Sequence, residues 1–125
     1  MLVVSRFSVD PAGQERFAAD ARVALDALAE RPGYLSGRVG RSVDDPAEWT
    51  VVTEWDGVGA YRRALSAYDV KVRATPLLAR SRDEPSAYEV LVTRDGAAGS
   101  AVVTASDRAA DADTAAPGPP RQEPS

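Results

Sequence analysis

The spacing of apolar residues predicts a β-strand at the start of the chain and an amphipathic helix after it. The strand is residues 2–9, where β-branched and aromatic side chains dominate. In residues 10–33 the apolar positions recur at helical spacing, Asp10 can cap the helix, and Pro11 suits its first turn. The Pro-Gly pair at the end of this segment is expected to stop the helix. The predicted buried stripe consists of Phe17, Ala21, Ala24, Leu25 and Leu28.

Two more strands follow and are expected to form a hairpin. Residues 34–42 alternate between apolar and polar positions, and residues 49–55 (WTVVTEW) carry the clearest strand pattern of the chain. The residues between them, VDDPAE, include Asp44 and Asp45 before a proline, which is typical of a turn. On the second of these strands Val52 lies on one face, and the opposite face is shared by Trp49, Val51, Thr53 and Trp55.

The second half of the pattern predicts helical segments and a fourth strand. Asp56 can cap a helix over residues 57–68, although two glycines weaken its first turn by about 1 kcal/mol each relative to alanine. A further helical turn is expected in residues 75–81, with Thr75 as the cap. Residues 86–93 complete the order as the last strand. Its two faces carry Tyr88, Val90 and Val92 against Leu91.

The order β-α-β-β-α-β predicts an α+β, ferredoxin-like fold, with a four-stranded antiparallel sheet and the helices on one face. Neither face of the predicted strands is uniformly polar. Because two helices cover only one face, the other would be an open apolar surface, which is unusual on a monomer. We therefore expect a homodimer joined through the sheets.

A change of composition predicts the domain boundary. Residues 1–95 are expected to form the domain, and residues 96–125 are dominated by small residues, aspartate and proline. Such a segment cannot offset its ordering entropy by burial, so we expect a disordered tail. One exception, AVVTA at residues 101–105, can form a short edge strand on this subunit or on a partner. No internal repeat is visible.

Composition excludes several classes of chemistry. The chain has 125 residues, a net charge of −4, no cysteine and no histidine. These absences exclude thiolate nucleophiles, histidine bases and the usual ligands of zinc, iron–sulfur clusters and haem. We therefore expect neither a metal nor a cofactor, and Asp56 and Glu54 are expected to serve as a cap and a surface group. An acidic chain has little attraction for nucleic acid, and its short apolar runs predict a soluble, cytoplasmic protein without a membrane segment.

Three stretches carry a resemblance to a known family. These are RF-V-PAG-E-F near the start, RPGYLSGRVGRSVDDPAEWTVVTEW and AYRRALSAYDVKVRATPLL, and the likeness covers roughly residues 2–94. They resemble the antibiotic biosynthesis monooxygenase (ABM) family of the dimeric α/β-barrel superfamily. The most specific pieces are the PG before the second strand, the R-S-DDP hairpin and the E-W that ends the third strand. The resemblance implies a ferredoxin-like protomer, a sheet-to-sheet dimer and a pocket between sheet and helices.

The resemblance also implies candidate activities. Similar members include cofactor-independent oxygenases that convert anthrone-type aromatic polyketides to quinones, haem-degrading enzymes, and proteins without an assigned activity. In the quinone-forming branch a tryptophan that ends the third strand and a tyrosine six residues later contribute to the pocket, and Trp55 and Tyr61 match both. An asparagine expected four residues before the tryptophan is here Val51. The haem-degrading branch relies on a histidine, which this chain lacks.

The expected function is thus a small monooxygenase for an electron-rich aromatic substrate. Trp55 would form a wall of the pocket, Tyr61 would hold a substrate oxygen, and Arg73 or Arg38 would stabilise the substrate anion. The candidate catalytic residues are Trp55, Tyr61 and Arg73, and the candidate substrate-binding residues are Tyr34, Arg38, Val51 and Tyr68.

Alternatives remain open from the sequence. Trp55 and Tyr61 can also be ordinary core residues, and the arginines, including Arg6, can be surface or ion-paired groups. At the level of the whole protein, the alternatives are a non-catalytic dimeric protein that binds a small hydrophobic ligand and a polyketide cyclase-like member of the superfamily.

Overall fold

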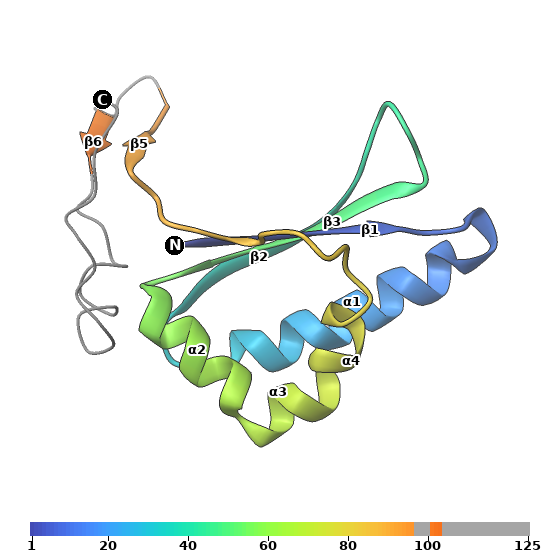
Figure 1. Ribbon diagram of the computed structural model, residues 1–125, viewed down its shortest axis with the longest axis horizontal. Helices are drawn as coiled ribbons and strands as arrows, with labels where there is room; N and C mark the ends of the chain where they lie inside the picture. Colours follow the sequence, from blue (N-terminus) through green and yellow to red (C-terminus); the bar gives the residue numbers. More distant parts are fainter. Residues whose placement is uncertain (97–100, 104–125) are drawn as a thin grey trace.

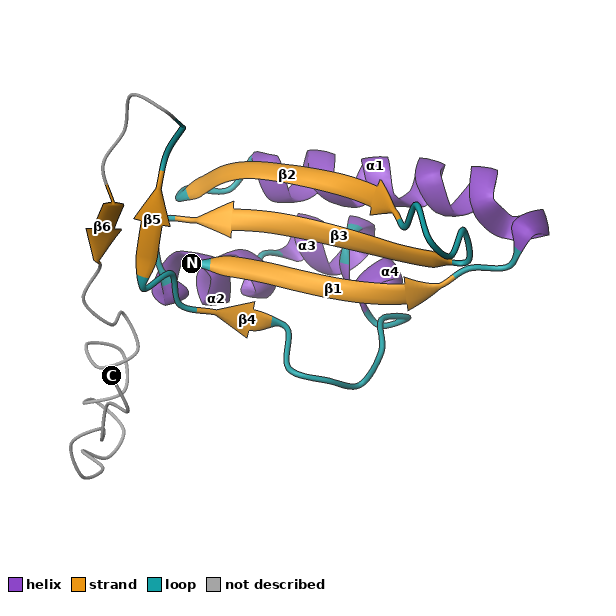
Figure 2. Cartoon of the chain, turned by 90° about the horizontal axis from the view of Figure 1, so that it is seen from above, coloured by secondary structure: helices purple, strands orange, loops and turns teal. Residues whose placement is uncertain are grey.

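A sheet forms one layer of the protein, and the helices pack on a single face of it (Figure 1). The structure is a computed structural model that describes residues 1–96 and 101–103. Four antiparallel strands lie in the order β2-β3-β1-β4 (Figure 2). Their bounds are β1 Leu2–Ser8, β2 Tyr34–Arg41, β3 Glu48–Trp55 and β4 Ala87–Tyr88. This is the predicted ferredoxin-like arrangement.

The helices α1, α2 and α4 lie at the predicted positions, α3 was not predicted, and the predicted caps are wrong. They are a 3₁₀ turn η1 at Pro11–Gly13, α1 at Gln14–Ala29, α2 at Val58–Ser66, α3 at Tyr68–Arg73 and α4 at Thr75–Leu78. The side chain of Asp10 makes no capping hydrogen bond, because the 3₁₀ turn separates it from α1. The backbone N–H of Asp56 donates to Gly33 O, and Gly57 occupies the cap position of α2. Thr75 is wrong as a cap too: it lies inside α4 and its hydroxyl donates to Val70 O.

The predicted second helix is divided by Ala67. Its backbone is extended, with φ −70° and ψ 137°. A helical ψ is negative, so the helix cannot continue through this residue. The chain therefore changes direction between α2 and α3, and the two short helices meet at an angle instead of forming one rod (Figure 1).

The fourth strand is much shorter than the predicted residues 86–93. Tyr88 pairs with Leu2, and the chain then runs past the first residue of β1, where the sheet offers no further partner. Residues Val92–Arg94 form a separate strand, β5, which pairs with β6 at Ala101–Val103. The predicted short strand thus exists, but it pairs with β5 and not with the edge of the main sheet. The rest of the predicted tail, 97–100 and 104–125, lies outside the described residues.

The core lies between the sheet and the helices. Its largest fully buried side chains are Trp55, Phe7, Phe17, Leu28 and Val70. Phe7 and Phe17 meet edge to face with ring centroids 4.9 Å apart, a favourable arrangement of two aromatic rings. Alanines on the buried side of α1 and α2 let these helices lie close to their neighbours.

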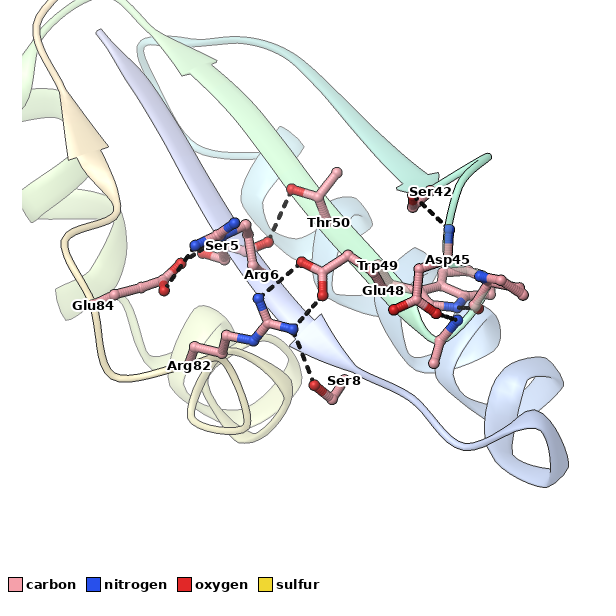
Figure 3. A network of polar contacts seen from close by, with 12 residues as sticks. Ser5, Arg6, Ser8, Ser42, Asp45, Glu48, Trp49, Thr50, Arg82 and Glu84 are labelled. Carbon is pink, nitrogen blue, oxygen red and sulfur yellow. Dashed lines mark hydrogen bonds and ion pairs between the residues drawn. The ribbon is translucent and has the colours of Figure 1, made fainter.

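The other face of the sheet is not covered by any described helix. Leu2, Val4 and Val52 are half-buried on it, and Tyr88 is 49% exposed. We call these four residues the open apolar patch. Beside them a polar network fastens residues 81–86 along β1 (Figure 3). In this network Arg6 pairs with Glu84, and Arg82 pairs with Glu48 and donates to Ser8.

Candidate functional site

Trp55 ends β3 and lies at the junction of the sheet with α2. Its side chain is only 1% exposed. The ring is 5.3 Å from that of Tyr34, perpendicular to it, and 5.5 Å from that of Tyr61 (centroid distances). The indole Nε1–H donates to Thr53 Oγ1 at 2.9 Å. Trp55 is therefore packed between two tyrosines, and its single donor is used inside the protein.

Two glycines allow this packing. Gly33 has φ +90°, a backbone angle that residues other than glycine rarely adopt, and a Cβ there would lie 2.4 Å from Ala60 Cβ in α2. A Cβ on Gly37 would lie 2.3 Å from the Tyr34 hydroxyl. The turn into β2 can thus approach α2 closely, and Tyr34 can lie over the strand toward Trp55 because both positions lack a side chain.

Tyr61 connects this cluster to an open groove. Tyr61 and Leu65 line it from α2, and the opposite side is formed by Lys71, Thr75, Leu78 and Ala79. The groove has a volume of about 550 Å³. That size is within the range of pockets for small organic ligands, and most of its lining is apolar. We call it the Tyr61 groove.

The Tyr61 hydroxyl is suited to act as a hydrogen-bond donor. Burial raises its pKa above the ordinary value of 10.0, so the phenol stays protonated at neutral pH. Among the described residues no hydrogen bond involves this hydroxyl, and it is not a buried unsatisfied atom. It can therefore donate to a ligand oxygen. The pKa of Tyr34 is raised as well, by burial and then by the negative charge of Asp26.

Arg73 lies in a different place from the Tyr61 groove. Its guanidinium contacts Asp69 at 2.7 Å and Glu30 at 3.4 Å, and the hydrogen bond to Asp69 is the main cause of its raised pKa. Its side chain lines a separate groove of about 340 Å³ between α1 and α3–α4, which Val23 and Arg80 also line. The structure does not bring Arg73 to Tyr61.

The other predicted residues are scattered. Arg38 pairs with Val52 in the β2–β3 ladder, so it lies on the open face of the sheet, away from the helices. Tyr68 is 81% exposed. Val51 is 2% exposed and belongs to the core between neighbouring strands. Of the predicted site residues, the structure brings together only Trp55, Tyr61 and Tyr34.

Several groove residues were missed by the sequence analysis. They are Leu65, Lys71, Thr75, Leu78 and Ala79. Their spacing could have indicated a shared helix face. Residues 61 and 65 lie one turn apart on α2, and residues 71, 75 and 78 follow at turns of three or four residues on α3 and α4. Periodicity can identify each set. It cannot show that the two sets line one groove, because this depends on the bend at Ala67.

Metal and membrane features are absent from the described part of the chain. Residues 1–96 and 101–103 contain no group of three or more His, Cys, Asp or Glu side chains that could bind a metal ion. No described helix has both the length and the apolar character needed to cross a bilayer.

Comparison with known proteins assigns the family. The profile described as "Antibiotic biosynthesis monooxygenase" (ABM) matches residues 1–72, a range that includes Trp55, Tyr61 and Lys71. It ends one residue before Arg73. No curated protein sequence matches the chain.

Solved structures agree with this family and with the fold. SnoaB, a cofactor-independent oxygenase from Streptomyces nogalater, is 28% identical with a TM-score of 0.57, over 72% of this chain and 94% of that one. A conserved protein from Methanosarcina mazei Go1 is 20% identical with a TM-score of 0.57, over 69% and 84% of the two chains. A Bordetella bronchiseptica protein described as "Putative antibiotic biosynthesis monooxygenase" is 20% identical with a TM-score of 0.56, over 72% and 96% of the two chains. The profile match covers more than half of the chain, and the protein belongs to the antibiotic biosynthesis monooxygenase family.

Proposed function

We propose that the protein is a cofactor-independent oxygenase that converts a hydroxylated aromatic of the anthrone type to a quinone. The observation that carries this proposal is the position of Tyr61, whose ring contacts buried Trp55 and which also lines an open, mostly apolar groove. The likeness to SnoaB, an oxygenase that needs no cofactor, supports it. So does the absence of cysteine and histidine, since this chemistry requires neither.

The proposed reaction takes its electrons from the substrate. An anthrone loses a proton from its CH₂ group, and the resulting anion passes one electron to O₂. The two radicals combine into a peroxide at that carbon, which loses water to form the new carbonyl. In sum, anthrone and O₂ give anthraquinone and H₂O. The protein's share is to orient the ring, exclude water and stabilise the negative oxygen of the anion.

In this proposal Tyr61 and Trp55 share the task of holding and stabilising the substrate anion. Tyr61 donates a hydrogen bond to the substrate oxygen on which negative charge develops. Trp55 acts through Tyr61, since its own donor is bound to Thr53 and its ring is buried. A catalytic role for Arg73 stays a prediction from the resemblance, and its two carboxylate partners argue against it.

The test is oxidation of an anthrone in air, with quinone formation followed by absorbance and oxygen uptake measured in parallel. Tyr61→Phe removes the hydroxyl and keeps the ring on Trp55, so we expect kcat to fall at least about tenfold, as when one donor to a developing oxyanion is lost. Tyr68→Phe is the matched comparison, because Tyr68 is 81% exposed and lines neither groove. No rate above that of buffer for the wild type, or equal rates for both variants and the wild type, would contradict the proposal.

A second candidate is a non-catalytic protein that binds an aromatic ligand in the same groove. The observations in its favour are that the Trp55 and Tyr61 rings pack against each other, that Val51 is a buried core residue, and that the Trp55 indole donates to Thr53. Ligand binding without oxygen uptake would select this candidate. Ring closure without oxygen uptake would select the cyclase-like alternative.

We also propose that the protein is a homodimer joined through the open faces of its sheets. Support comes from the open apolar patch, which the helices leave uncovered, and from family membership. Light scattering after size-exclusion chromatography tests this. A monomer mass at micromolar concentration would contradict it.

A further inference from the structure

Lys71 is the only lysine of the chain. Among residues 1–96 and 101–103 it is also the only charged residue that lines the Tyr61 groove. It lies on α3, across the groove from Tyr61 and Leu65 of α2. The rest of the lining is apolar except for the hydroxyls of Tyr61 and Thr75. A single positive charge therefore stands beside a surface that otherwise suits a flat hydrocarbon ring.

This charge is not neutralised by the described part of the chain. Within residues 1–96 and 101–103, no carboxylate lies within ion-pair distance of the Lys71 ammonium. Arg73 on the same helix is different, since it contacts both Asp69 and Glu30. An ammonium is a compact charge on a flexible stem, so Lys71 can reach an anion at the mouth of the groove.

Few other donors are available to a ligand there. The Thr75 hydroxyl donates to Val70 O, and the backbone N–H of Lys71 donates to Ala67 O. The Tyr61 hydroxyl and the Lys71 ammonium are left as the two side-chain donors of the groove. Together with apolar walls from Leu65 and Leu78, they match a ring system that carries a negatively charged oxygen.

We infer that Lys71 binds the oxyanion of an aromatic ligand, so that the groove selects anionic aromatics over neutral ones. This inference rests on the proposed function, because it names the chemical class that the Tyr61 groove accepts. The oxyanion can be an ionised ring hydroxyl or a carboxylate on the ring, and both offer the same partner to an ammonium. In either case Lys71 positions the ring against Tyr61.

The experiment uses three probes and four proteins. The probes are alizarin, whose absorption moves to longer wavelength when its hydroxyl ionises, an anthraquinone carboxylate, and a neutral hydroxymethylanthraquinone of similar size. Calorimetry gives the affinities of the wild type, Lys71→Met, Lys71→Arg and Arg62→Met. Lys71→Met removes the charge and keeps an apolar side chain of similar length, and Lys71→Arg keeps the charge. Arg62→Met is the matched control, since Arg62 is exposed on α2 and does not line the groove.

We expect the wild type to bind an anionic probe about twofold to fivefold more tightly than the neutral one, the range for a solvent-exposed ion pair. Lys71→Met should lose this preference, and Lys71→Arg and Arg62→Met should keep it. The two sources of the oxyanion are told apart by the probes. A red-shifted spectrum of bound alizarin that Lys71→Met abolishes identifies the ring hydroxyl, and a preference for the carboxylate probe alone identifies the carboxylate.

Two results would overturn the inference. If the wild type binds the charged and neutral probes equally, or if Lys71→Met keeps the preference, Lys71 does not bind the oxyanion, and the oxygenase proposal stands on its own test. If none of the probes binds the wild type, both this inference and the assignment of the Tyr61 groove as the ligand site are wrong.

Discussion

Gly33→Ala is expected to disturb the junction that positions Tyr61. Gly33 precedes β2, accepts a hydrogen bond from the backbone of Asp56, and has φ +90°. An added Cβ would lie 2.4 Å from the Cβ of Ala60, closer than real Cβ contacts. Neither atom belongs to a flexible side chain, so the backbone of the turn or of α2 must move.

The magnitude has two parts. A left-handed backbone conformation costs an L-residue about 1–2 kcal/mol relative to glycine. Overpacking of a filled site costs about 1–3 kcal/mol more. Together they predict a loss of about 2–5 kcal/mol, a large part of the roughly 5–15 kcal/mol that stabilises a typical domain. The overpacking cost depends on Ala60, and the cost of the left-handed backbone does not.

Urea unfolding followed by tryptophan fluorescence measures this loss, at a fixed protein concentration because a dimer is proposed. With a slope near 2 kcal/mol/M, the midpoint should fall by at least about 1 M. Gly40→Ala is the matched control, since a Cβ there meets only Thr50 Cγ2, at 3.4 Å. Its midpoint should stay the same or rise slightly, because glycine weakens a strand by about 0.5–1 kcal/mol.

A double-mutant cycle with Ala60→Gly separates the two parts. Ala60→Gly alone should cost about 1 kcal/mol in a helix. In the Gly33→Ala background it removes the clashing methyl, so we expect a favourable coupling of about 1–3 kcal/mol. Additive effects would show that the contact between Gly33 and α2 is not tight. A midpoint of Gly33→Ala equal to that of Gly40→Ala would refute the whole argument.

Three further predictions concern other parts of the molecule. Val52→Lys places a charge in the open apolar patch and should convert the proposed dimer to a monomer in light scattering, whereas an unchanged mass would contradict association through the sheets. Arg82→Met should lower stability by less than about 1 kcal/mol, because its ion pair is partly exposed, but should speed hydrogen exchange in residues 81–86; unchanged exchange would show that the pair does not fasten this segment. Burial raises the pKa of Tyr34 and Tyr61, so the folded protein keeps protons that the unfolded chain loses near pH 10, and the free energy of unfolding should fall as the pH rises through that range. In urea titrations Tyr61→Phe should weaken this pH dependence, and an unchanged dependence would count against the burial of Tyr61.

The sequence predicted those parts of the fold in which local pattern and tertiary contact agree. The strands β1 and β3 and the long helix α1 carry a clear period and a buried face, so propensity and packing favour the same structure. The fourth strand fails this condition. Residues 86–93 have strand propensity, but β1 begins at Leu2, so only Ala87 and Tyr88 pair with it, and Val92 and Thr93 pair with β6 instead. The length of a strand depends on where the neighbouring strand starts, and the apolar pattern of a strand carries no information about this.

The candidate site shows the same division. The contact between Trp55 and Tyr61 was predictable, because a strand end and the first turns of the next helix must lie close together. The opposite side of the groove was not. Lys71 comes within reach because the chain bends at the extended residue Ala67, between α2 and α3, and no apolar period marks that bend. Arg73 does not line this groove, because it lies two residues after Lys71 on α3, and a step of two residues along a helix places a side chain on another face.

The direction of the β3 side chains determines which elements can offer a polar contact to a ligand in the Tyr61 groove. Val51, Thr53 and Trp55 share the buried face of the strand, and the only polar groups among their side chains, the Thr53 hydroxyl and the Trp55 indole, bind each other. β3 therefore has no side-chain donor left for a ligand along this face. Any polar contact to a ligand in the groove must come from the helices, where Tyr61 and Lys71 provide it. An asparagine introduced as Val51→Asn would be buried among apolar neighbours and should lower stability, so it is not expected to raise activity unless the ligand itself reaches the sheet.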